Sequence, residues 1–441
     1  MLKKVFFLFL ALLFLGVTFR LLIPSTQHAA ATQSTLDSMV LQTMNDIDKN
    51  GWNAAVKGTF INWYITNPAT QQNTGHDSQN DLRDYEAMVW YKALHPTDTS
   101  QDQYIQRILP TVQAEWGNSN LSKGWVYAIF LRLAKYAGSS WNTTAQNWAA
   151  SNYTKVTAAN GVPLGPIVED TGANAPTCPS GYRIDQNLET GLMLIDAGKR
   201  FNHPEWAQAG AKEVSQIDQQ AFNQSVHLYA RIMCQGKVWD NIAKDGEMGQ
   251  EAQAYLDAGS YTGNQAYLAK GEEMLDAIAN PATGFIDNTN GGIWFQKDLG
   301  TGVVDTGKKV MQQFAVLQAF YTGDLLFNNR YSAATNNMIT AIQKSFVPGS
   351  VPGWMYERAP DFTQYKTENW ISVEASGMAI EAILTMESNS SLPTSPLPST
   401  TPLPTSGGTL PAGSTPVSIS VGLQDIGNGG DISTGSTTGG N

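Results

Sequence analysis

A helical pattern repeats along most of the chain. Apolar residues recur at intervals of three and four, the spacing of amphipathic helices, and the helical stretches form pairs joined by short turns. The turns lie at residues 94–96, 136–138, 201–203, 261–263 and 321–323, so their centres are 42, 65, 60 and 60 residues apart. The sequence therefore predicts an array of helical hairpins.

Two further helices are expected at the ends of this array, over about residues 35–49 and 371–387, and each lacks a partner in its own part of the chain. Pairing them with each other turns five complete hairpins into a ring of six. We therefore predict an all-α fold, an (α/α)6 toroid of six inner and six outer helices over residues 32–387. An open solenoid is the alternative, because the sequence alone does not prove closure.

The connections between hairpins are longer than the turns within them. Three successive connections, at residues 158–185, 220–246 and 280–307, are each about 28 residues long, and loops of this length are commonly functional. All three belong to the end of the toroid where the inner helices begin, so unpaired helix N–H groups point there as well. We expect the functional site at this end.

The N-terminal segment has the composition of a secretory signal. Two lysines precede an apolar run over residues 5–17, and Ala29-Ala30-Ala31 follows, the order typical of a signal peptide. Residues 1–31 are therefore predicted to be a signal peptide, or an uncleaved N-terminal anchor if residues 19–23 extend the apolar run. The expected location is extracellular or at the cell surface.

The C-terminal segment has a different composition. Residues 388–441 hold 37 Ser, Thr, Pro or Gly residues among 54 and no aromatic residue, which is too little apolar surface to form a core. We expect a disordered tail that acts as a spacer or has no function. Attachment to a cell wall or a membrane through the termini is the corresponding partner hypothesis.

Charge and composition narrow the choice of ligand. The formal net charge is -11 at pH 7, which excludes nucleic acid as an expected partner, since phosphate binding requires a basic surface. Twelve Trp residues in a chain with only 15% charged residues fit a large core or a surface that binds flat, hydroxylated ligands. No metal or cofactor motif is present: the Asp287–Gly292 segment lacks EF-hand spacing, and there is no zinc, P-loop or dinucleotide signature.

Both cysteines fall in neighbouring long connections, Cys178 in the first and Cys234 in the second. In an exported chain two cysteines are more often paired than free. We expect a Cys178–Cys234 disulfide, with two separate thiols as the alternative.

Carboxylates and tryptophans dominate the end where the inner helices begin. Cleavage of a bond between sugars requires one carboxylic acid as proton donor and one carboxylate as nucleophile or base, and Trp faces stack on sugar rings. The candidate catalytic residues are Glu247, paired with Asp245, Asp81 or Asp84. The candidate substrate-binding residues are Trp294, Trp354, Trp370, Asp185, Glu251 and Arg358. Each acid also has a plain structural explanation, because acidic side chains favour first helical turns.

Three stretches resemble parts of glycoside hydrolase family 76, the α-1,6-mannanases. They are Gly246–Glu251 with its continuation to Gly263, the run Gly291-Gly292-Ile293-Trp294-Phe295, and residues 308–324. The resemblance covers about 80 residues and implies an (α/α)6 fold and a glycoside hydrolase that acts on a polysaccharide or oligosaccharide. One position departs from the family: where it has two adjacent Asp residues, this chain has Gly246 and Glu247.

Two other functions remain open. An epimerase or lyase of the same six-hairpin class would move a proton with a His, Tyr or Arg side chain, and His76 and His227 are the histidines expected at the functional end. A non-catalytic glycan-binding or cell-wall protein would keep the aromatic cleft without the paired acids. The changed dyad and the C-terminal tail support this alternative.

Overall fold

The computed structural model describes residues 33–71, 75–117, 122–168, 177–363 and 369–390. The predicted signal peptide or anchor, and nearly all of the predicted tail, lie outside these residues. Within them no helix has the length and apolar character needed to cross a membrane.

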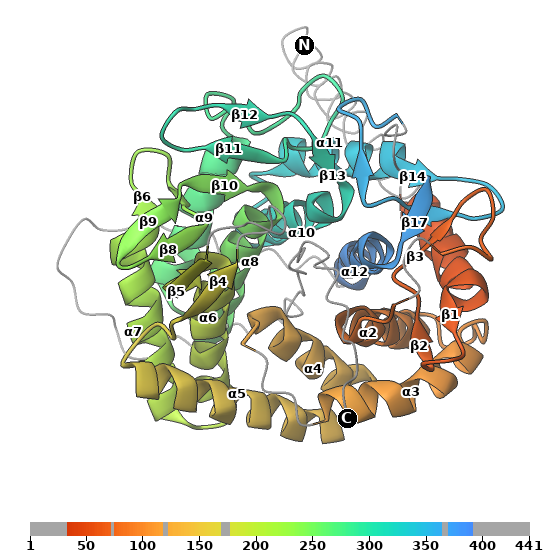
Figure 1. Ribbon diagram of the computed structural model, residues 1–441, viewed down its shortest axis with the longest axis horizontal. Helices are drawn as coiled ribbons and strands as arrows, with labels where there is room; N and C mark the ends of the chain where they lie inside the picture. The colour runs from red at the N-terminus through yellow and green to blue at the C-terminus, as the bar shows by residue number, and fades with distance from the viewer. Residues whose placement is uncertain (1–32, 72–74, 118–121, 169–176, 364–368, 391–441) are drawn as a thin grey trace, which may run out of the picture.

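Helices make up most of the described chain and alternate between an inner and an outer ring (Figure 1). The inner helices are α2 (Ser78–Leu94), α4 (Gly124–Tyr136), α6 (Ile184–Arg200), α8 (Asp245–Thr262), α10 (Val310–Leu326) and α12 (Val373–Ser390). The outer helices are the helix over residues 33–46, α3 (Asp102–Trp116), α5 (Ser140–Ala159), α7 (Pro204–Ala221), α9 (Gln265–Ala279) and α11 (Ser332–Ser345). A short π-helix, η1 (Ile47–Gly51), continues the first of these.

The burial pattern explains which helices lie inside. Helix α8 is buried on every side from Asp245 to Gly259, as expected for a helix surrounded by protein. Helix α3 buries only one stripe, Tyr104, Ile108, Val112 and Trp116, each one turn from the next, as expected for a helix with one face in solvent. The inner ring therefore forms the core, and the outer ring covers it.

Contacts between the first and last inner helices close the ring. Helix α12 packs against α2, Trp90 Nε1 donates a hydrogen bond to Ser388 Oγ at 2.9 Å, and Arg83 pairs with Glu381 at 3.5 Å. The first outer helix covers this junction, with Asp37 close enough to Glu387 to affect its titration. The predicted toroid is confirmed, and the open solenoid is excluded for the described residues.

The long connections contain short strands, which the sequence analysis did not anticipate. The largest sheet has the order β4-β5-β8-β9 and joins two neighbouring connections; its strands are β4 (Gly165–Val168), β5 (Thr177–Arg183), β8 (Ile232–Cys234) and β9 (Lys237–Asp240). The disulfide Cys178–Cys234 links β5 to β8, as predicted.

Smaller sheets cover the rest of this end. They comprise β1 (Trp52–Asn53) with β2 (Gly58–Thr59), β17 (Trp370–Ser372) with β3 (Asn62–Tyr64), β6 (Phe222–Asn223) with β7 (Leu228–Tyr229), β10 (Ile242–Lys244) with β11 (Gln296–Asp298) and β12 (Val304–Asp305), β13 (Lys308–Lys309) with β16 (Glu357–Arg358), and β14 (Phe346–Val347) with β15 (Gly353–Trp354).

One predicted turn is wrong. Residues 321–323 lie inside α10, which continues to Leu326. The chain turns instead at Asn328 and Asn329, which adopt left-handed conformations with φ of 56° and 61°. Gly323 serves close packing rather than a turn, because a Cβ there would lie 2.5 Å from Leu275 Cδ1.

Candidate functional site

Glu247 lies in the first turn of α8 and is held by two arginines. Its Oε1 accepts hydrogen bonds from Arg183 Nη2 at 2.5 Å and from Arg231 Nε at 3.2 Å. Arg183 also binds Asp185 with two hydrogen bonds, at 3.1 and 2.9 Å. The Glu247 carboxylate is therefore fixed from two sides by charge-assisted hydrogen bonds.

Glu251 lies one turn further along the same helix in a contrasting environment. Burial raises the pKa of Glu251 well above its usual range, and three neighbouring carboxylates raise it further. These carboxylates are Asp185, Glu247 and Glu189. The α6–α8 side of the barrel therefore combines a carboxylate held by arginines with a carboxyl group that favours its protonated form, the arrangement by which acid and base roles are separated.

Asp245 does not join this group directly. Its Oδ1 accepts from Gly246 N at 2.9 Å and its Oδ2 from Gln313 Nε2 of α10 at 3.3 Å. Its carboxyl group thus binds the α10 side of α8, whereas Glu247 binds the arginines on the α6 side. Burial raises the pKa of Asp245 well above its usual range.

Asp81 and Asp84 lie on α2, on the opposite side of the inner ring from α8 (Figure 1). Asp81 accepts from the backbone N–H of Thr59 at 2.7 Å. Burial, and then the charge of Asp81, raise the pKa of Asp84 well above its usual range. The structure therefore does not bring either acid together with Glu247.

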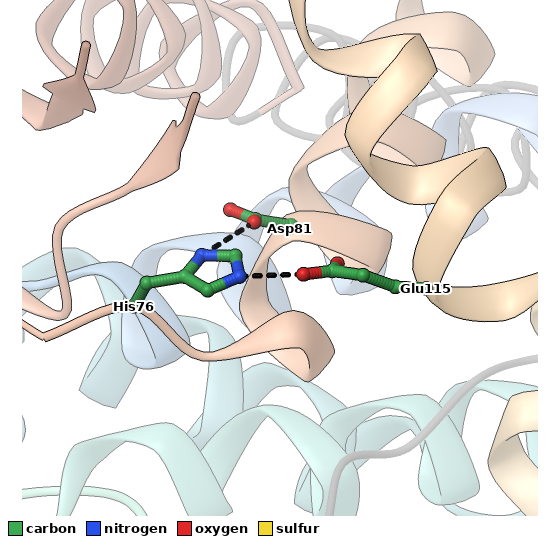
Figure 2. Close-up of side chains that lie close together, drawn as sticks. All are labelled: His76, Asp81 and Glu115. Carbon is green, nitrogen blue, oxygen red and sulfur yellow. Dashed lines mark hydrogen bonds and ion pairs between the residues drawn. The ribbon is translucent and has the colours of Figure 1, made fainter. Parts of the chain in front are cut away.

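His76 lies between two carboxylates (Figure 2). Its Nδ1 is 2.8 Å from Asp81 Oδ2, and its Nε2 is 2.5 Å from Glu115 Oε1 of α3. Hydrogen bonds to Asp81 and then Glu115 raise the pKa of His76 to about 10. These three residues could each offer a metal ligand within 4.8 Å of the others. However, the carboxylates approach opposite ring nitrogens, which is the arrangement of an ion-paired imidazolium.

The second histidine expected at this end is His227. It pairs with Glu273 of outer helix α9 at 2.6 Å, and about half of its side chain is exposed. Its partner therefore places it on the outer ring.

The expectation that Trp354 binds sugar is wrong. Trp354 is fully buried, donates from Nε1 to the carbonyl of Ile342 at 3.1 Å, and packs edge-on against Phe314 and Phe346. A sugar ring cannot reach its faces. Trp370 is also largely buried, at 6% exposure, and stacks on Tyr356 with ring centroids 6.4 Å apart.

Trp294 is half-buried and lies beside the buried amine of Lys308, whose Nζ is 3.9 Å from the centre of the indole ring. The same Nζ donates to the carbonyl of Gly291 at 3.0 Å and pairs with Asp287 at 3.2 Å. Burial lowers the pKa of Lys308 to about 8. Lys308 thereby fastens the Gly-rich loop to the start of α10.

Arg358, the remaining predicted contact residue, lies opposite Lys308 in the β13–β16 pair. Its Nη1 is 2.8 Å from Met355 Sδ. It belongs to the connection before α12, away from the partners of Glu247.

A cavity lies between α4, α6 and α8. Its lining includes Trp125, Glu189, Met193, Gln250, Gln253 and Asp257. The indole N–H of Trp125 and Oε1 of Gln253 are buried without a hydrogen-bond partner in the described part of the chain. Buried polar atoms of this kind favour a water or a ligand oxygen as partner.

Trp125 and Lys123 at the start of α4 were missed by the sequence analysis, because this inner helix has no acidic residue in its first turn. Lys123 donates to Gln79 of α2 at 2.7 Å. Burial lowers its pKa, as does the nearby Arg183. The available signal was a Trp at the start of an inner helix, next to a cation.

No family model matches this sequence, and no curated protein matches it either. Solved structures do match in fold. Cellobiose 2-epimerase from Bacillus thermoamylovorans is 10% identical with a TM-score of 0.60, over 80% of this chain and 100% of that one. A GH76 α-mannanase from Bacteroides thetaiotaomicron is 10% identical with a TM-score of 0.57, over 80% and 97%.

An unsaturated glucuronyl hydrolase from a Bacillus species is 12% identical with a TM-score of 0.58, over 81% of this chain and 97% of that one. At these identities the likeness extends to the fold alone. It agrees with the six-hairpin toroid observed here, and the proteins that share it act on different sugars by different reactions.

Proposed function

We propose that this protein is a carbohydrate-active enzyme that hydrolyses glycosidic bonds. The observation that carries the proposal is the contrast between two acids one turn apart on α8. Glu247 accepts hydrogen bonds from Arg183 and Arg231, and burial with neighbouring carboxylates raises the pKa of Glu251. Glycoside hydrolysis requires such a pair, because one group protonates the leaving oxygen while the other acts as nucleophile or base.

In this mechanism Glu251 donates its proton to the oxygen of the departing sugar. The Glu247 carboxylate either attacks the anomeric carbon or removes a proton from the attacking water. Asp185 and Glu189, which face Glu251 from α6, favour its protonated form before the reaction. Trp125 and Gln253 in the adjacent cavity offer a donor and an acceptor for sugar hydroxyls.

Hydrolysis is favoured over epimerisation or lyase chemistry by the positions of the histidines. His76 is engaged by carboxylates on both ring nitrogens, and His227 pairs on the outer ring. Among the described residues, no histidine lines the cavity. An α-mannan-like polysaccharide is the first substrate to test, because of the local sequence resemblance.

We also propose that the chain works outside the cytoplasm, at the cell surface or in the medium. The Cys178–Cys234 disulfide supports this location, because such bonds persist in oxidising compartments. The termini would then provide secretion and attachment.

The test is to incubate the purified protein with α-mannans, glucans and uronic-acid polymers and to measure new reducing ends. We expect Glu251→Gln and Glu247→Gln each to lower kcat at least 100-fold, as general acid–base roles imply. A matched control is Glu213→Gln, which neutralises a fully buried acid of outer helix α7 and should leave the rate unchanged.

Three other results would each replace this proposal. Products that absorb as unsaturated uronides mean a lyase. Epimerised sugars without new reducing ends mean an epimerase. Tight binding of a glycan by the wild type and both variants, with no turnover by any of them, means a binding protein.

A further inference from the structure

The two arginines that hold Glu247 lie at the adjacent ends of two paired strands. Arg183 is the last residue of β5, and Arg231 directly precedes β8. In the antiparallel β5–β8 pair, Arg183 lies opposite Ile232, and Ile184 N donates to the carbonyl of Arg231 at 3.0 Å. The backbones of the two arginines are therefore adjacent, although the residues belong to different connections.

Each arginine has a second acidic partner that sets its orientation. Asp185 binds the guanidinium of Arg183 through both oxygens, a geometry that fixes the plane of the guanidinium. Asp240 lies 3.4 Å from Arg231 Nη1, and the backbone N–H of Arg231 donates to the carbonyl of Asp240 at 3.1 Å. The contacts therefore form a chain of alternating acidic and basic side chains, in the order Asp185, Arg183, Glu247, Arg231 and Asp240.

The disulfide joins the same two strands. Cys178 precedes Arg183 on β5, and Cys234 is the last residue of β8, the strand that follows Arg231. The covalent link therefore lies in the segments that carry both guanidinium groups, where it restricts sliding or separation of the strands.

We propose that Arg183 and Arg231 are positioning residues that orient the Glu247 carboxylate for reaction, and that the disulfide-linked β5–β8 sheet holds both arginines in place. This inference rests on the proposed role of Glu247.

The other charged groups around Glu247 are mostly acidic and act in the opposite direction. They are Asp185, Glu251, Asp245 and, beyond the arginines, Asp240. Among these neighbours only the two arginines attract the Glu247 carboxylate, through the hydrogen bonds described above.

The test compares Arg231→Gln, Arg231→Lys and the double variant Cys178→Ser/Cys234→Ser in the full chain. Removing a cation favours the protonated form of a carboxylate. We therefore expect Arg231→Gln to move the acidic limb of the kcat profile about one pH unit upward and to lower kcat about tenfold, with KM little changed. Arg231→Lys should return the limb close to its wild-type position, and the cysteine variant should move it in the direction of Arg231→Gln by a smaller amount.

A matched control is Arg107→Gln, which breaks another Arg–Asp pair, that with Asp48, and should leave the limb in place. A second readout needs no activity: the difference in Tm between wild type and Arg231→Gln should narrow as the pH falls, because protonation of Glu247 removes the ion pair. The inference would be refuted if the acidic limb of the Arg231→Gln kcat profile stayed at the wild-type pH and the Tm difference did not change with pH. Full activity of Glu247→Gln would instead remove the proposed catalytic role of Glu247.

Discussion

Replacing His76 with glutamine gives a test of the structure that is independent of function. The imidazole joins the connection before α2 to Asp81 of α2 and Glu115 of α3 (Figure 2). Hydrogen bonds to these acids raise the pKa of His76 from 6.5 to about 10. A raised histidine pKa stabilises the folded state fully below the unfolded value of 6.5, and this stabilisation is lost as the pH rises through the folded value.

The magnitude follows from this difference. At about 1.4 kcal/mol for each pH unit, a rise from 6.5 to about 10 corresponds to an upper limit of about 5 kcal/mol. Solvent reaches 22% of the His76 side chain and 23% of that of Glu115, and screening reduces the gain from such pairs. We expect His76→Gln to lower the free energy of unfolding by about 2 kcal/mol at pH 6.

The assay is urea unfolding of wild type and variant at several values between pH 6 and 10. The difference in free energy of unfolding between wild type and variant should shrink as the pH rises, because the wild type loses its charged imidazole between pH 6 and 10. His227→Gln is the matched control: it removes a half-exposed histidine that pairs with one carboxylate, so the expected loss is about 0–1 kcal/mol at any pH. A loss for His76→Gln that stays constant from pH 6 to 10 would refute the reasoning.

The two tryptophans with contrasting positions should respond differently to replacement by phenylalanine. Trp354→Phe removes the buried hydrogen bond from the indole to the Ile342 carbonyl, which keeps Ser345 Oγ as a donor, and should cost about 1 kcal/mol of stability in a denaturation assay without changing glycan affinity. Trp125→Phe removes an unpaired N–H at the cavity and should weaken glycan binding in calorimetry about tenfold, with a smaller change in stability. The reverse pattern would contradict the site assignment. Loss of the disulfide in Cys178→Ser/Cys234→Ser, which links positions 56 residues apart, should lower the free energy of unfolding by about 2–5 kcal/mol, and an unchanged denaturation midpoint would count against this.

The ring could be predicted from the sequence because its helices follow simple patterns. Outer helices such as α3 carry one apolar stripe, and an unpaired helix at each end of the array leaves a ring as the simplest arrangement. The turn at residues 321–323 was misplaced because glycine permits both turns and close helix packing. Only the packing of Gly323 against Leu275 and Tyr331 shows which use applies.

The site was less predictable, because it depends on contacts between connections. The sequence places Glu247 and Glu251 on one helix face, which the structure retains. It does not show that Arg183 and Arg231 meet at Glu247, because that contact depends on the pairing of β5 with β8. Trp354 was misassigned because its place in a connection at the functional end does not show its burial, and β15 turns its indole into the core.

Closure of the ring by α12 has a consequence for how the chain folds. Trp90 and Ser388, which bond across the junction of α2 and α12, are 298 residues apart. The entropy lost on closing a loop of this length is on the order of 5 kcal/mol, and contacts of such long range slow folding. During synthesis one side of α2 therefore stays uncovered until α12 has been made. The packing that stabilises the earliest inner helix is completed only by the last one.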